Sequence, residues 1–200
     1  CTGENLNKLF HNDQQSLSSK NKTTSSSKTK YQPSSTVAPS FAAMQRNLGM
    51  VPNLYATLAH SPVLFNGFLA FADALGKGRL TTTQRELLAL AIGQSNECQY
   101  CLSAHTLLAS KAGLSVDAIK SARQGNAESP LDNALLQLAT ALVHQRGVLT
   151  DEQLANVRHA GVDDELMLEV LGQVVVNTLT NYGNHLAATE IDFPIVPLRP

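Results

Sequence analysis

Two cysteines and a histidine stand at a spacing that could support redox chemistry. Cys98 and Cys101 are three residues apart and His105 follows Cys101 by four, so on a helix all three lie along one face. Asn96 is expected as the N-cap, which would put both cysteines in the first turn. There the helix dipole and the unpaired backbone N–H groups lower the pKa of a thiol. The spacing therefore predicts a thiolate nucleophile and a dithiol that can close into a disulfide.

A carboxylate on the preceding helix is the fourth candidate. Glu86 shares a helix face with Ala89, Leu90 and Gly93, and a carboxylate on such an apolar face is unusual. If this face packs against the cysteines, Glu86 can orient His105 or accept a proton through it, and burial would raise the pKa of its carboxyl toward neutrality. Taken by itself, Glu86 would more often be a solvated helix residue.

The elements that must position these residues are all helices. From Val37 onward the chain is rich in Ala and Leu at helical spacing, and no strand pattern of useful length occurs. Helix starts are marked by Ser61-Pro62, Thr81, Ser129-Pro130 and Thr150. The expected helices cover residues 62–75, 81–95, 98–112, 115–123 and 129–145, with a short helix from 150 and a long one over 163–188. The predicted fold class is therefore all-α.

The long last helix is expected to bury one apolar stripe. The stripe consists of Met167, Val170, Leu171, Val174, Val175 and Thr178. Asn177, Asn181, Asn184 and His185 continue it, and such residues are usually satisfied buried polar groups or contacts between helices. A direct role of His185 in the site is the alternative.

Composition and charge exclude several classes of protein. The chain has 200 residues, is 43% hydrophobic and carries a net charge of -1, which suits one compact domain with a tail and indicates no nucleic-acid surface. Apolar runs such as residues 87–92 are too short to span a bilayer. Three cysteines do not form the even framework of a disulfide-stapled domain, so Cys98 and Cys101 are available for chemistry.

Residues 1–36 differ from the rest and predict a flexible tail or tether, followed by a domain over 37–200. The stretch 16–30 is almost wholly Ser, Thr, Lys and Asn, so burial cannot offset its ordering entropy. Two interpretations of Cys1 stay open. Cys1 is either the lipidated N-terminus of a cell-envelope lipoprotein, which would be a membrane tether, or simply where the sequence starts, in which case a cytoplasmic location is expected.

Residues 85–87 (REL) and 97–105 (ECQYCLSAH) resemble the AhpD-like alkylhydroperoxidases of the carboxymuconolactone decarboxylase superfamily. The family pattern is a Glu about twelve residues before the first Cys of a CxxC pair, then a His four after the second Cys. Glu86, Cys98, Cys101 and His105 match all four positions. The runs 177–185 and 191–194 resemble the C-terminal end of the peroxidase-related members. The resemblance covers about residues 40–196.

This resemblance implies an AhpD-like helical bundle that works as a homo-oligomer. It also implies Cys101 as the attacking thiol, Cys98 as the resolving thiol, and Glu86 and His105 as a proton relay. The decarboxylase branch lacks the CxxC pair, so its presence favours a peroxidase-type oxidoreductase of antioxidant defence. The substrate would be a hydroperoxide and the electron donor an unidentified thiol or dithiol. The redox-active Cys98–Cys101 disulfide would serve in place of any cofactor or metal, and Tyr100 leaves room for a different redox potential or partner.

Three plainer interpretations stay open. The two cysteines, His105 and Glu86 could together hold a structural zinc ion, although such sites usually draw ligands from two separate knuckles. The cysteines could instead be small buried apolar residues. The protein could also be a non-enzymatic envelope or interaction protein that retains the helical scaffold. Thiol titration separates these classes, because a low-pKa thiol that cycles to an intramolecular disulfide indicates an enzyme.

Overall fold

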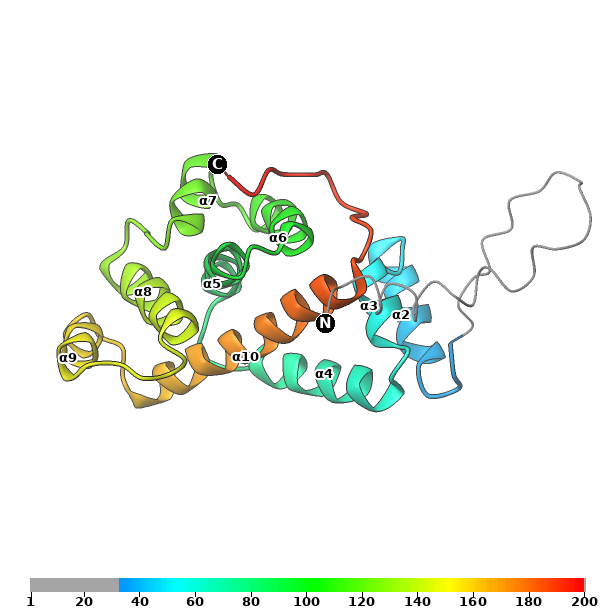
Figure 1. Cartoon of the computed structure of the whole chain (residues 1–200), viewed down its shortest axis with the longest axis horizontal. Coiled ribbons are helices and arrows are strands. Elements are labelled where there is room, and N and C mark those ends of the chain that lie inside the picture. The colour runs from blue at the N-terminus through cyan, green and yellow to red at the C-terminus, as the bar shows by residue number, and fades with distance from the viewer. Residues whose placement is uncertain (1–32, 200) are drawn as a thin grey trace, which may run out of the picture. The chain divides into compact units, whose positions relative to one another are not determined.

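The computed structural model describes residues 33–199 (Figure 1). Most of the expected tail, including Cys1, lies outside the described residues. Within them the chain forms only helices, turns and loops, which confirms the all-α fold class. The helices are α2 (Ala38–Leu48), α3 (Asn53–Leu58), α4 (Pro62–Leu75), α5 (Thr82–Ser95), α6 (Gln99–Lys111), α7 (Val116–Arg123), α8 (Pro130–His144), α9 (Asp151–His159) and α10 (Asp164–Ala187).

Helix boundaries follow the capping signals in the sequence. The side chain of Thr81 accepts a hydrogen bond from the backbone N–H of Gln84, whose own side chain accepts one from the Thr81 N–H. Thr150 forms the same reciprocal capping box at the start of α9. Ser115 and Ser129 cap α7 and α8 through their hydroxyl groups. The predicted starts of these four helices are therefore confirmed.

The described chain divides into two compact units. The first consists of the residues up to Asn66 together with Gly183–Glu190, and it contains α2, α3, the start of α4 and the end of α10. Phe65 is fully buried there, and its ring meets the rings of Phe41 and Tyr55 edge-on, with centroids 5.7 and 6.4 Å apart. Aromatic packing of this kind favours edge-to-face geometry and anchors this unit.

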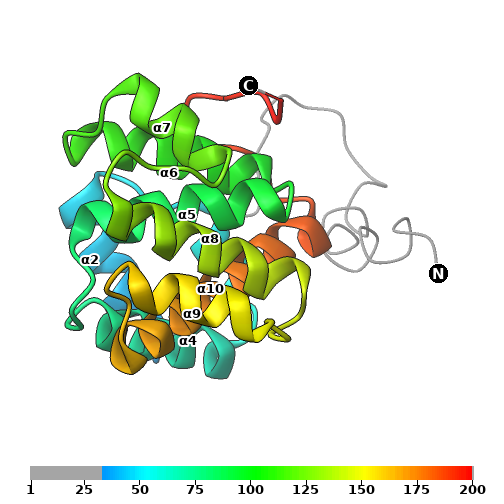
Figure 2. The ribbon, with the colours of Figure 1, turned by 90° about the vertical axis from the view of Figure 1, so that its left-hand side faces the viewer.

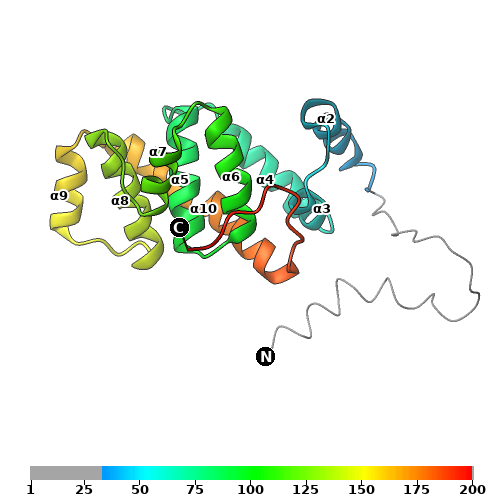
Figure 3. The same ribbon diagram turned by 90° about the horizontal axis from the view of Figure 1, so that it is seen from above.

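The second unit, Gly67–Tyr182 with Ile191–Pro200, contains all four predicted site residues. Helix α5 forms its centre: every residue from Leu87 to Gly93 is buried, and α6, α7 and α8 pack around it (Figures 1 and 2). Seen from above, α5 and α6 run side by side (Figure 3). A helix that is apolar around its whole circumference belongs in a core. Helix α5 therefore gives Glu86, which directly precedes the buried run, a rigid support.

Helix α10 differs from the predicted apolar stripe. Leu171 and Val175 are 41% and 49% exposed, so the prediction is wrong for these two residues. Val170 and Val174 are buried as expected, beside polar residues. The buried polar residues of α10 are Gln173, Asn177, Thr180, Asn181 and Asn184. Apolar residues lie on two faces of α10, one buried and one exposed, and the predicted stripe combines residues from both faces. Among the described residues no helix has the length and apolarity needed to cross a membrane.

A carboxylate of α10 anchors the segment that leads into α5. The two oxygens of Glu169 accept hydrogen bonds from the backbone N–H groups of Arg79, at 2.8 Å, and Leu80, at 3.0 Å. A Cβ atom at Gly78 would lie 2.6 Å from this carboxylate, so a side chain there would push the end of Glu169 away from these N–H groups. The contact therefore holds the segment that leads into α5 against α10.

Candidate active site

The connection between α5 and α6 is a tight turn. Asn96 is the C-cap of α5 and donates its backbone N–H to the carbonyl of Ile92 at 2.9 Å. Glu97 then adopts a left-handed φ of 54°, which is uncommon for a non-glycine residue. The N–H of Cys98 donates to the carbonyl of Gly93 at 2.9 Å and closes the turn. Helix α6 therefore starts later than predicted, and its N-cap is Cys98 rather than Asn96.

Cys98 caps α6 with its own sulfur. Its backbone is extended, and its Sγ accepts a hydrogen bond from the backbone N–H of Cys101 at 3.3 Å. Cys101 lies in the first turn of α6, where the helix dipole favours negative charge. We call residues 98–101 the dithiol turn. The hydrogen bond to the Cys98 sulfur and the start of the helix both favour negative charge at this turn.

The two thiols are buried and in contact. Cys98 is 0% and Cys101 3% exposed, and their Sγ atoms lie 2.6 Å apart. Helix α5 comes close at this point, because Gly93 has no side chain: a Cβ there would lie 3.7 Å from the Cβ of Cys101. The pair is therefore held between packed helices, and a disulfide between the two sulfurs needs no large backbone movement.

His105 and Glu86 form a hydrogen-bonded pair across α5 and α6. Nδ1 of His105 lies 2.8 Å from Oε2 of Glu86, and the two side chains are 25% and 16% exposed. A carboxylate accepts from an imidazole N–H, so the contact places a proton on Nδ1 and leaves Nε2 for a second partner. The predicted orientation of His105 by Glu86 is the geometry found.

The pKa of His105 is set by opposing causes. Burial lowers it, while the hydrogen bond to Glu86 and the negative charges of Glu86 and Cys101 raise it, and the net result is a pKa above the usual value. The attraction between His105 and Cys101 is mutual, because an imidazolium favours a neighbouring thiolate as much as the thiolate favours the imidazolium. The site therefore brings two contacting thiols close to an imidazole that a carboxylate orients.

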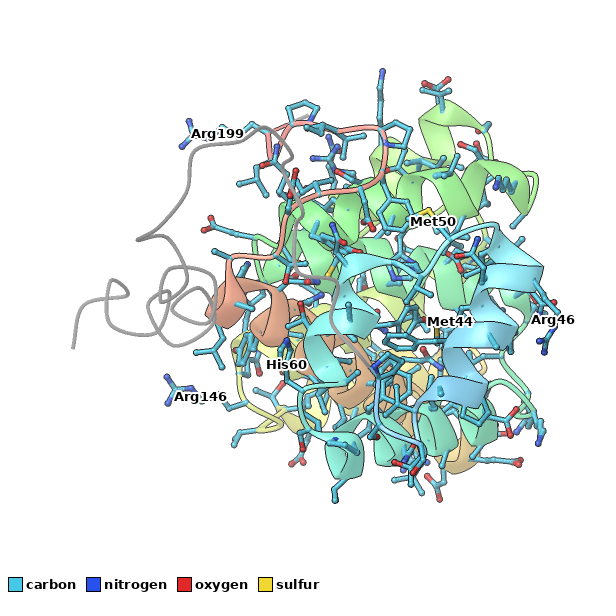
Figure 4. All side chains as sticks on the ribbon, turned by 90° about the vertical axis from the view of Figure 1, so that its right-hand side faces the viewer. Met44, Arg46, Met50, His60, Arg146 and Arg199 are labelled. Carbon is cyan, nitrogen blue, oxygen red and sulfur yellow. The ribbon has the colours of Figure 1, made fainter. Side chains whose placement is uncertain are left out.

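Two further histidines and the amides of α10 lie outside the dithiol turn and the His105–Glu86 pair. His60 follows α3 in the first unit (Figure 4), and His185 is exposed in the last turn of α10. Asn181 is fully buried, and its Oδ1 accepts from Nδ2 of Asn96 at 2.9 Å. This amide pair links α10 to the turn that leads into Cys98, which is a helix contact of the kind expected for these residues.

Sequence reasoning missed the residues that bind the C-terminal segment. Gln99 and Tyr100 separate the cysteines, and only Tyr100 was considered, for its effect on redox potential or partner. Both residues contact residues 193–196, and Ser103 and Arg123 contact residues 196–198. Gln99 and Ser103 are four residues apart, which is the only signal in the sequence that they share a helix face.

A metal site was among the alternatives. In the part of the chain that the structure describes, no three His, Cys, Asp or Glu side chains are arranged to hold a metal ion.

The chain resembles a known protein family in sequence and several solved proteins in structure. The model of the carboxymuconolactone decarboxylase family matches residues 62–142, which include all four site residues. A solved structure of an alkylhydroperoxidase AhpD core, an uncharacterized peroxidase-related protein from Ralstonia eutropha JMP134, is similar with a TM-score of 0.72 and 24% identity, over 81% of this chain and 91% of that chain.

Two further solved structures share the fold. An uncharacterized peroxidase-related protein from Silicibacter sp. TM1040 has a TM-score of 0.70 and 21% identity, over 77% of this chain and 83% of that one. The debrominase Bmp8 has a TM-score of 0.67 and 19% identity, over 78% and 86%. No curated protein matches the sequence. The likeness to these structures is one of fold.

Proposed function

Because the chain belongs to the superfamily of the AhpD-like proteins and the carboxymuconolactone decarboxylases, we propose that it is a thiol-dependent peroxidase that reduces hydroperoxides through Cys98 and Cys101. One juxtaposition carries the proposal: two contacting thiols and a hydrogen-bonded carboxylate–imidazole pair lie together on α5 and α6. A nucleophile beside a proton donor, itself oriented by a third group, is the arrangement that covalent catalysis requires.

In the first step the thiolate of Cys101 attacks the outer oxygen of the hydroperoxide. The S–O bond forms as the O–O bond breaks, and the leaving alkoxide takes a proton from the imidazolium of His105. The products are an alcohol and a sulfenic acid on Cys101. Cys101 is assigned the attack because it lies one helical turn before His105 on α6, on the same helix face. Glu86 holds the imidazolium in place.

In the second step the thiol of Cys98 attacks the sulfur of the sulfenic acid. The S–S bond forms, the S–O bond breaks, and the hydroxyl group leaves as water with the proton of Cys98. The 2.6 Å between the sulfurs supports this step without an opening of the turn. An external thiol or dithiol then returns two electrons and two protons to the disulfide and is itself oxidised.

The exposure of the site suggests the direction of approach. Both sulfurs are buried, whereas His105 and Glu86 keep a partial contact with solvent. The hydroperoxide would enter past the imidazole, which would then lie next to the oxygen that leaves.

We also propose that the protein is a homo-oligomer, and the outer face of α10 supports this. Its exposed apolar residues are Leu168, Leu171, Val175, Tyr182 and Leu186. Their spacing of three, four and seven residues matches the seam along which two helices pair. Contiguous exposed apolar residues of this kind mark interaction surfaces.

The direct test is consumption of hydrogen peroxide and of small alkyl hydroperoxides by the reduced protein, with a panel of thiol and dithiol donors. We expect turnover with at least one dithiol, and a loss of two hydrogens from the peptide that contains both cysteines when the donor is left out. Unchanged thiols after exposure to every peroxide of the panel would refute the proposed function.

A further inference from the structure

The C-terminal segment Ile191–Arg199, which we call the strap, is an extended chain in the same compact unit as the dithiol turn. It runs past α6 to α7 (Figure 1). Side chains of α6 hold its backbone: the carbonyl of Val196 accepts from Nε2 of Gln99 at 3.0 Å, and the N–H of Val196 donates to Oγ of Ser103 at 3.2 Å. Both polar backbone groups of one strap residue are thus satisfied by α6.

Arg123, at the end of α7, holds the next part of the strap. Its Nη2 donates to the carbonyls of Pro197, at 2.7 Å, and Leu198, at 3.0 Å, and its Nε donates to Oε1 of Gln94 at 2.8 Å. The guanidinium is buried, and burial lowers the pKa of Arg123. A buried cation is costly unless it is hydrogen-bonded, so Arg123 and the docked strap stabilise each other.

The strap also contacts both residues that separate the cysteines. Gln99 bonds to Val196, and the ring of Tyr100 meets the ring of Phe193 edge-on, with centroids 5.5 Å apart. Ile195 and Arg199 are exposed on the strap and take no part in these contacts, and Figure 4 shows the side chain of Arg199 pointing away. The strap therefore restrains the dithiol turn through its two central residues.

This restraint acts differently on the two redox states. In the dithiol state the sulfur of Cys98 caps α6 by accepting the N–H of Cys101. In a disulfide that sulfur can bear no negative charge, so it becomes a weaker acceptor and the first turn of α6 loses part of its cap. Gln99 and Tyr100 lie in this turn, so a strap that holds them favours the capped, reduced geometry.

We propose that Arg123 and the strap are positioning elements for the dithiol: by holding Gln99 and Tyr100 they stabilise the reduced turn and raise the reduction potential of the Cys98–Cys101 couple. By linkage, formation of the disulfide weakens docking of the strap by the same factor. The proposal rests on the proposed function in one respect, because it requires the two thiols to form a reversible disulfide.

The test is the reduction potential of the couple in the full chain, equilibrated with a small dithiol–disulfide buffer. Two electrons and two protons pass from the cysteines to the buffer disulfide, and alkylation followed by mass spectrometry gives the oxidised fraction. Arg123→Gln and Phe193→Ala loosen the strap at two separate contacts. Arg199→Gln and Ile195→Ala are matched controls at exposed positions of the strap.

We expect Arg123→Gln and Phe193→Ala each to shift the equilibrium toward the disulfide by roughly fivefold to tenfold, a typical coupling between two sites. For a two-electron couple this corresponds to a potential lower by about 20 to 30 mV. The control variants should match the wild type, and circular dichroism should show that each variant keeps its helices. Hydrogen exchange at the N–H of Val196 should be faster in the oxidised than in the reduced protein.

Equal potentials in all five proteins would overturn the proposal, and so would controls that shift as much as the two strap variants. Equal exchange at Val196 in the two redox states would overturn the linkage. A wild-type protein that forms no disulfide in any buffer would instead refute the proposed function, and this inference with it. The two failures are therefore distinguishable.

Discussion

Helices α5 and α10 are both rich in aliphatic residues, yet α10 buries amides beside its valines and leaves several aliphatic residues exposed, which α5 does not. Helix α5 is buried along Leu87–Gly93. Its polar residues lie toward its two ends, and one of them, Glu86, contacts His105. Helix α10 buries amides such as Asn177 and Asn181 and exposes Leu171 and Val175. The difference fits the two proposals: α5 supports the proposed chemistry, and α10 presents an exposed apolar face that a second copy would cover in the proposed homo-oligomer.

Removal of a sulfur atom from the dithiol turn should have the largest effect on activity. We expect Cys101→Ser to lose all peroxide turnover, because the attacking atom is gone. Cys98→Ser should react once and accumulate a sulfenic acid or mixed disulfide on Cys101, which trapping and mass spectrometry would detect. If Cys98→Ser is inert and Cys101→Ser is trapped, the roles of the two cysteines are exchanged, although the class of chemistry stays.

Glu86→Gln tests whether the polar end of α5 works as a relay. The substitution keeps the size of the side chain but removes its charge, so the rate of the peroxide reaction should fall by about 10²- to 10⁴-fold, the usual range for a general acid–base group. His105→Asn should cause a similar loss, and the double variant little more than either, because members of a relay act as a unit. Stopped-flow measurement of thiol oxidation gives the rates.

Additive losses in the double variant would show that Glu86 and His105 act separately. An unchanged rate in Glu86→Gln would leave the carboxylate with a structural role only. The control is the melting temperature of each variant, which separates a lost relay from a lost fold.

The two helices should also respond differently to loss of an aliphatic side chain. Leu90→Ala in α5 creates a cavity in the core and should lower the free energy of unfolding by about 2 to 5 kcal/mol at any protein concentration. Leu171→Ala in α10 should destabilise the protein by less, and in a way that depends on protein concentration, since it would weaken association. Denaturation at two protein concentrations checks this. A loss for Leu171→Ala that is independent of concentration would contradict an interface at α10.

The smallest expected effect is the dependence of stability on pH. The pKa of His105 is raised in the folded protein, so protonation of this residue favours folding. Its contribution is fully present below the unfolded pKa of about 6.5 and is lost as the pH rises through the folded pKa. The stability difference between the wild type and His105→Asn, measured by urea denaturation under reducing conditions, should shrink with rising pH. A difference that is constant or grows would contradict the ion pair with Glu86.

Structural features that depend on interactions within one turn of the chain could be predicted from the sequence. Thr81, Ser115, Ser129 and Thr150 start helices because their hydroxyl groups satisfy N–H groups within the same turn, and that pattern is visible in the chain. The grouping of Glu86 with His105 came from spacing within α5 and α6 and from the family pattern. The N-cap was misplaced at Asn96 because a sulfur acting as cap has no strong sequence signal.

Features that depend on distant segments could not be predicted in the same way. The strap is held by side chains that bond to backbone groups of residues 196–198, and a backbone group carries no sequence signature. The predicted stripe of α10 includes the exposed Leu171 and Val175 because apolar periodicity shows that residues share a helix face, without showing whether anything covers that face.

The anchor between Glu169 and the backbone of Arg79 and Leu80 has a consequence for the kinetics of folding. It joins positions 90 and 89 residues apart, so a long loop must close before the contact forms. Local helices form sooner than such a contact, so we expect it to be absent from the transition state for folding and to open early in unfolding. Weakening it through Gly78→Ala, whose Cβ would collide with the carboxylate, should speed unfolding while leaving the rate of refolding nearly unchanged. The lifetime of the native state, more than the ease of reaching it, would then depend on one glycine that lies outside the candidate site.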